Sequence, residues 1–255
     1  MEFDAVIYGL TLVAAVGLAG LSKGGFAGVG IIATPLMALV MPPVLAASVM
    51  LPILLIQDAY SVVVYRRSVD WRNIAILLPG AVAGIVSAYL LVAHLSQPAV
   101  TLAIGCIAFV FALRSLLARS ASSATPPAPA ARAVAPGLFW GAVSGFTSMI
   151  SHAGSPPFQI YVMPQKLHRD LFVGTSVVFF AAVNWIKVLP FLLLGQLTSE
   201  SLWISAALAP VAIISTFVGV RLVRLLDTER FYTVAYVLLL LVGLKLGWDG
   251  LTGLL

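Results

Sequence analysis

The stretch LVAAVGLAGLSKGGFAGVGIIATPLMALVM, residues 12–41, decides the fold class, because its only charged side chain is Lys23. A membrane-spanning helix needs about 20 mostly apolar residues, and the residues up to position 21 supply them. Residues 22–25 then interrupt the run, and residues 26–41 are too short and too rich in Gly and Pro to span alone. Irregular backbone at membrane depth persists only beside protein or a water-filled cavity. The stretch therefore predicts a re-entrant hairpin or a broken helix.

The whole chain has the composition of a membrane protein. Of its 255 residues, 61% are hydrophobic and 9% are charged, whereas soluble domains are about 45–50% apolar and about 25% charged. We therefore expect an all-α polytopic membrane protein. The apolar segments lie at about 4–21, 26–41, 43–65, 73–93, 98–118, 134–150, 156–165, 171–194, 201–226 and 231–252.

Two parts of the chain match each other at a nearly constant spacing, which predicts an internal duplication. A second polar break precedes the short segment 156–165, as the first precedes 26–41. We divide the chain into a first transmembrane repeat at 1–118, a linker rich in Ala, Ser and Pro at 119–133, and a second repeat at 134–255. Chance is the alternative explanation, because Gly and Pro are common in membrane helices. The pairs at a spacing of 129 are Ser22 with Ser151, Gly25 with Gly154 and Pro35 with Pro164, and Pro79 precedes Pro210 by 131.

The basic residues predict an orientation, because short cytoplasmic loops are enriched in Lys and Arg. If each hairpin enters and leaves on one side, 11 of the 14 basic residues fall on the side of linker 119–133. That linker is then cytoplasmic, both termini are external, and the two repeats have inverted topology, as in many secondary transporters. The 11 residues are Arg66, Arg67, Arg72, Arg114, Arg119, Arg132, Lys166, Arg169, Arg221, Arg224 and Arg230.

The polar breaks are the candidate site for a small anionic substrate. A half-helix that begins at a break directs free N–H groups and its positive dipole end toward the membrane interior, where an anion can bind. Lys23 adds a full positive charge, and its counterpart His152 can donate a hydrogen bond or titrate. The alternatives are a Lys23 that snorkels to the surface and a structural histidine. The candidate residues are Ser22, Lys23, Gly24, Gly25, Ser151, His152, Ala153, Gly154 and Ser155, with backbone amides of 24, 25 and 153–155 as donors.

Charged and amide side chains within other apolar segments are candidates for a gate or a coupling group. Asp58 and Lys187 are 129 positions apart, so an inverted repeat would bring them close enough for an ion pair. A buried structural pair is the alternative, since intramembrane charges usually face a cavity or a partner. Gln57, Asn184 and Gln159 are candidate polar groups of the cavity wall.

The sequence contains no signature of an enzyme or a metal site. HExxH, GxSxG and Walker A motifs are absent, and Cys106 is the only cysteine, which excludes an intrachain disulfide and a cysteine metal cluster. We expect no catalytic activity, no metal, no cofactor and no nucleic-acid partner. The expected surroundings are the lipid bilayer, and the sequence leaves a homodimer open.

Both breaks resemble the signatures of a known family. Residues 17–26, continuing from Gly30 to Leu36, resemble the glycine-rich first signature of the TauE/SafE sulfite exporter family, and residues 141–146 with 151–157 resemble its second. The resemblance implies export of small sulfur-containing anions, such as sulfite or organosulfonates, across the bacterial inner membrane. Many members have glycines where this chain has Lys23 and residues 152–153, so the family name does not by itself define the substrate.

We therefore predict a secondary transporter that exports a small sulfur oxyanion by alternating access, with the anion at the midplane between two helix N-termini. An anion channel, or an exchanger for another small anion, would use the same residues with a different pore or a different partner ion. A membrane enzyme or assembly factor that uses Lys23 and His152 for chemistry is the other alternative.

Overall fold

The computed structural model describes residues 2–23, 29–92, 94, 96–120, 131–222 and 228–255, and in these residues it contains helices and no strand. Six of the described helices are long and apolar enough to cross a membrane, so the prediction of an all-α, multi-pass membrane protein is confirmed. The elements are α1 (Glu2–Lys23), η1 (Val29–Ile32), α2 (Ala33–Met37), α3 (Pro43–Tyr65), α4 (Trp71–Val92), α5 (Gln97–Ser120), α6 (Val134–Ser151), α7 (Ser155–Val162), η2 (Met163–Gln165), α8 (Arg169–Leu193), α9 (Ser199–Leu222) and α10 (Thr228–Thr252).

The helices follow the predicted apolar segments closely, and both interrupted segments are short helices. η1 and α2 contain only four and five residues, and α7 contains eight. α6 ends because His152 has a left-handed backbone, with φ of 56°. α7 begins at Ser155, and its next two residues are Pro156 and Pro157, which suit a first helical turn. α5 continues to Ser120, so the first two residues assigned to the linker belong to a helix. Helix ends predicted from sequence are uncertain by such margins.

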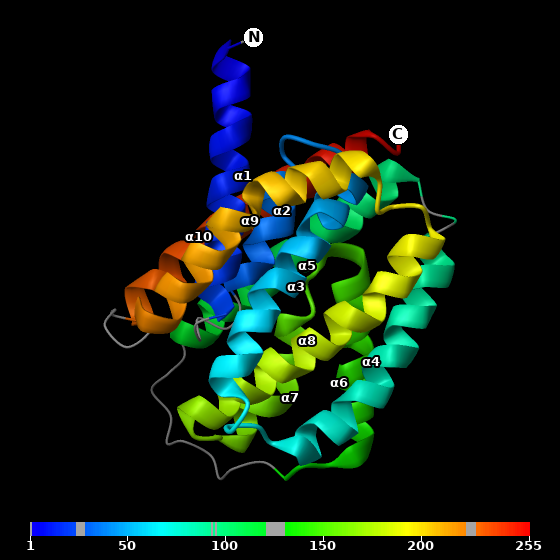
Figure 1. Ribbon diagram of the computed structural model, residues 1–255. Coiled ribbons are helices and arrows are strands. Elements are labelled where there is room, and N and C mark those ends of the chain that lie inside the picture. The colour runs from blue at the N-terminus through cyan, green and yellow to red at the C-terminus, as the bar shows by residue number, and fades with distance from the viewer. Residues whose placement is uncertain (1, 24–28, 93, 95, 121–130, 223–227) are drawn as a thin grey trace.

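The main helix pairs join the two halves of the chain (Figure 1). α4 packs on α6, α5 on α10 and α1 on α9, while α3 contacts both α8 and α9. The four long helices of the first half, α1, α3, α4 and α5, can be matched in order with α6, α8, α9 and α10 of the second half. The α4–α6 pair then corresponds to the α9–α1 pair. The α3–α9 pair corresponds likewise to the α8–α4 pair, which is also present. The main helix pairs thus correspond when the halves are exchanged.

Glycines allow the closest of these helix pairs to form. A Cβ added at Gly84 of α4 would lie 1.9 Å from the carbonyl oxygen of Ala142 in α6. On the other side, a Cβ at Gly145 of α6 would lie 2.0 Å from the carbonyl oxygen of Ala81. In a bilayer, helix association depends on close van der Waals packing, which small residues permit. The glycine spacing therefore holds α4 directly against α6.

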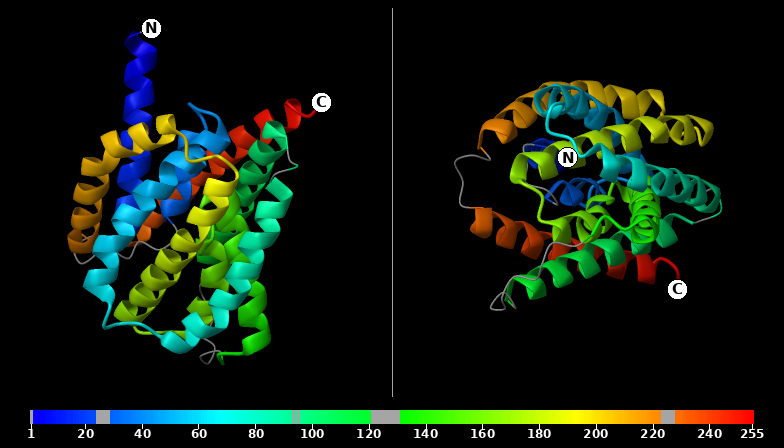
Figure 2. Two further views of the ribbon diagram at one scale, coloured as in Figure 1. Left: turned by 45° about the vertical axis from the view of Figure 1, so that its right-hand side comes forward. Right: turned by 90° about the horizontal axis from the view of Figure 1, so that it is seen from below.

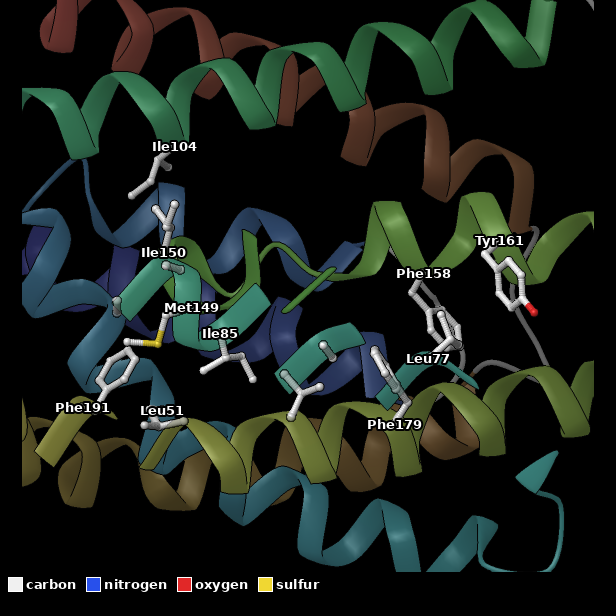
Figure 3. Close-up of a cluster of buried hydrophobic side chains, with 14 of the residues drawn as sticks. Leu51, Leu77, Ile85, Ile104, Met149, Ile150, Phe158, Tyr161, Phe179 and Phe191 are labelled. Carbon is white, nitrogen blue, oxygen red and sulfur yellow. The ribbon is translucent and has the colours of Figure 1, made fainter. Parts of the chain in front are cut away.

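A buried aromatic cluster anchors the short helix α7 (Figure 3). Phe158 has no exposed surface and stacks on Phe179 of α8, with ring centroids 5.1 Å apart. Leu77 of α4 and Met149 of α6 belong to the same core cluster. Aromatic pairs of this kind stabilise by about 0.5–1.5 kcal/mol beyond the area they bury. Packing therefore fixes the position of α7, and with it the residue that begins this helix, Ser155.

The two chain ends lie at the same end of the molecule, and the α3–α4 connection, the start of α6 and η2 lie at the other (Figures 1 and 2). A polar layer joins the segments at that second end. The side-chain amides of Asn73 and Gln165 exchange hydrogen bonds of 2.9 and 3.1 Å. Asp70 accepts the backbone N–H of Asn73 at 3.2 Å and pairs with Arg132 at 2.7 Å. This layer connects the beginning of α4 to the second half.

Candidate functional site

A cavity of about 70 Å³ lies where the two broken segments meet α1, α3, α6 and α8. Gly30 and Ile31 of η1 and Ser155 of α7 line it, so the starts of both short helices face the same space. A volume of this size exceeds what one water molecule needs several-fold, and a small oxyanion fits it. Its polar lining residues are Ser22, Lys23, Ser148, His152, Ser155, Ser176 and Asn184.

The structure places the predicted site residues in three groups. Ser22, Lys23, His152 and Ser155 line the cavity together with Asn184. Three others are not among its lining residues and form local bonds instead. Ser151 donates to Thr147 O at 3.4 Å, Ala153 O accepts the Thr147 hydroxyl at 2.9 Å, and Gly154 O accepts the Ser144 hydroxyl at 2.7 Å. Gly24 and Gly25 lie outside the described residues.

Asp58 is held from two sides at the edge of the cavity. It is 1% exposed, and its Oδ1 accepts a hydrogen bond from the Lys23 ammonium in an ion pair. Its Oδ2 accepts a hydrogen bond of 2.7 Å from the side-chain amide of Asn184. Both donors line the cavity, so the carboxylate lies directly behind its wall.

The expected pair between Asp58 and Lys187 is not formed, and each residue has different partners. Lys187 follows Asn184 by almost one helical turn of α8. Asn184 therefore occupies the position facing Asp58, while Lys187 reaches the end of α6. The spacing of 129 residues identified two buried charges correctly but could not distinguish neighbouring turns of the same helix.

Lys187 is completely buried and bonded to the end of α6. Its Nζ lies 3.1 Å from Ser148 O, 3.0 Å from Ser148 Oγ and 2.6 Å from His152 Nδ1. These three acceptors match the three donors of an ammonium group. His152 Nε2 lies 2.9 Å from Ala47 O, a carbonyl that can only accept. The partners assign a neutral His152 that is protonated at Nε2, with both ring nitrogens occupied.

The start of α7 offers fewer backbone donors than expected. The first turn of a helix normally has several unpaired N–H groups, but Pro156 and Pro157 have none. The N–H of Phe158 donates to Gly154 O at 3.3 Å, and that of Ala153 donates to Thr147 O at 3.3 Å. The Ala153 N–H, a predicted donor to the anion, is therefore already bonded to the backbone in this structure. The Ser155 side chain lines the cavity and accepts a hydrogen bond from Gln159 at 2.8 Å.

Two polar residues of the site were missed, and one predicted residue lies elsewhere. Ser148 and Ser176 line the cavity. Ser148 precedes His152 by four positions, a spacing that places both on one helix face and could have identified it. Gln57 is 1% exposed but donates to Val16 O at 3.2 Å, so it joins α3 to α1 and is not among the lining residues.

The charges at this cavity favour an anionic ligand. Lys23 lines the cavity, and Lys187 bonds to Ser148 of its lining. Asp58 is the one carboxylate among the described residues that line the cavity or bond to its lining. Burying a charge without a partner is costly, and a small anion in the cavity beside Lys23 would balance the surplus. No group of His, Cys, Asp and Glu that could hold a metal ion occurs among the described residues.

Comparison with known proteins gives one match, to a family. The family described as "Sulfite exporter TauE/SafE" matches residues 12–246, nearly the whole chain. Neither the curated proteins nor the solved structures give a match. The match includes every residue of the cavity and both broken segments. This chain therefore belongs to the TauE/SafE sulfite exporter family of membrane transporters.

Proposed function

We propose that the protein is a secondary transporter that exports a small sulfur oxyanion, sulfite or an organosulfonate, across the bacterial inner membrane. The observation that carries this proposal is the cavity at the junction of the two halves. Lys23 lines it, Lys187 bonds to two of its lining residues, and Asp58 is the one carboxylate bonded to its lining among the described residues. Membership of a sulfite exporter family agrees with an anionic cargo.

The anion would bind between Lys23 and the start of α7. Lys23 supplies the charge, and the hydroxyls of Ser22, Ser155 and Ser176 are donors of suitable chemistry around the same space. Charged hydrogen bonds are about twice as strong as neutral ones, so Lys23 should contribute most of the affinity. Lys187 acts from behind the wall through Ser148 and His152.

Alternating access by movement of one half against the other is supported by the packing. The cavity is lined by helices of both halves, and the helix pairs correspond when the halves are exchanged. We infer two repeats of inverted topology, with linker 119–133 in the cytoplasm and both termini outside. The membrane potential then favours export, by about 2.3 kcal/mol per charge per 100 mV.

Sulfite efflux from proteoliposomes tests the proposal. Lys23→Gln should abolish saturable efflux, because it removes the charge that faces the anion. Lys245→Gln is the matched control, since Lys245 is 61% exposed and paired with Asp249 on the surface of α10. Equal efflux in the Lys23→Gln protein and the wild type would refute the site. Saturation and counterflow would identify a carrier, while a rate that rises linearly with concentration would indicate an anion channel.

A further inference from the structure

We propose that Asp58 makes the cavity selective for singly charged oxyanions over doubly charged ones. Sulfite would then cross as its hydrogen-sulfite monoanion, and sulfonates would cross in their ordinary monoanionic form. The inference rests on the proposed function, because it names the charge of the ligand that the same site accepts.

The proposal starts from the charges that surround the cavity. Among the described residues that line it or bond to its lining, the charged side chains are those of Lys23, Lys187 and Asp58. His152 is neutral by its hydrogen bonds to Lys187 and Ala47. Residues 24–28, next to Lys23 in the chain, carry no charged side chain in the sequence. Lys187 donates to three acceptors, as an ammonium group does. With Lys187 and Lys23 as cations and Asp58 as a carboxylate, the surplus is one positive charge, which one monoanion neutralises.

The Asp58 side chain is fixed in place beside the cavity when an anion arrives. The residue is 1% exposed, and Asn184 holds its Oδ2 at 2.7 Å independently of Lys23. An anion that binds to the Lys23 ammonium therefore lies next to the carboxylate of Asp58. A monoanion leaves the group of charges neutral, whereas a dianion leaves one negative charge in excess beside the buried carboxylate.

The size of the effect follows from Coulomb's law. At an effective dielectric of about 20, a surplus unit charge within about 6 Å changes affinity by about a hundredfold. Relaxation of the site reduces this value, so we take a tenfold change as the threshold for the test.

Methanesulfonate and sulfate are suitable probes, because both have a tetrahedral sulfur with oxygens and they differ by one charge. Binding of each to the purified chain is measured by calorimetry, and the quantity compared is the ratio of the two affinities. Asp58→Asn should shift this ratio toward sulfate by at least tenfold. Ser176→Asp, which adds a carboxylate to the cavity wall about two turns of α8 away from Asn184, should shift it toward methanesulfonate. Asp249→Asn removes a surface carboxylate of α10 and should leave the ratio unchanged.

The outcomes separate this proposal from the function on which it rests. An unchanged ratio in both Asp58→Asn and Ser176→Asp, with methanesulfonate still bound, overturns charge selection and leaves the anion site intact. Absence of binding of sulfite, sulfate and methanesulfonate to folded wild-type protein overturns both proposals. If Asp58→Asn does not fold, Ser176→Asp decides, since its shift toward methanesulfonate supports selection and a constant ratio refutes it.

Discussion

Replacing Lys23 with Met leaves the carboxylate of Asp58 buried without a cation, and we expect a large loss of stability. The two side chains of this pair are 11% and 2% exposed. At a separation of about 4 Å and an effective dielectric of about 20, their attraction is about 4 kcal/mol. Removal of one partner from a buried pair typically costs about 3–5 kcal/mol. Because Asn184 still donates to Asp58, we expect a loss of about 3 kcal/mol.

The double variant Lys23→Met/Asp58→Asn provides the decisive comparison. It removes both charges, and replacement of a whole buried pair by neutral groups is often neutral or stabilising. The free energy of unfolding of the wild type, both single variants and the double variant is measured by SDS titration in mixed micelles. We expect the double variant to be more stable than Lys23→Met alone. Losses that add independently, with less than about 1 kcal/mol for Lys23→Met, would refute the account of a coupled buried pair.

Three further predictions concern packing, polar contacts and exposure. Gly84→Leu should separate α4 from α6 and destabilise the protein by more than about 3 kcal/mol, whereas Gly9→Leu, which has no neighbour within 4 Å, should change the unfolding free energy little. Asn73→Leu and Gln165→Leu should each cost about 1–3 kcal/mol, because each leaves a buried amide unpaired; the double variant should cost less than their sum. Cys106 is exposed near the middle of α5, inside a candidate membrane span, so a membrane-impermeant maleimide should label it in the unfolded protein but not in sealed vesicles.

Much of the fold was predictable because a bilayer imposes a strong rule on sequence. Each spanning helix must be apolar over about 20 residues, and segments such as 43–65 coincide with observed helices. The breaks were predictable for a related reason, since Ser22, Lys23 and His152 are out of place in continuous apolar helices. Gln57 shows the limit of that reasoning: it is buried and polar, yet it bonds to Val16 O rather than lining the cavity.

The partners within the site were less predictable, because hydrogen bonds depend on positions to within a fraction of a helical turn. Asp58 could have met either of two buried lysines, and only the packing of α3 against α1 and α8 pairs it with Lys23. The prolines that indicated a helix start also lack backbone N–H groups. They therefore reduce the number of amide donors available to an anion at the start of α7, although such donors were expected there from the sequence.

The sequence by itself determined that this is a membrane protein of the TauE/SafE family. It also determined the number and extent of the apolar segments and the positions of the two polar breaks. These properties depend on composition and spacing along the chain. Only the tertiary structure decided that Lys23 binds Asp58, that Lys187 binds Ser148 and His152, and that both broken segments face one cavity. Those contacts join residues from distant helices, and their geometry is set by how the helices pack, which no local pattern of residues specifies.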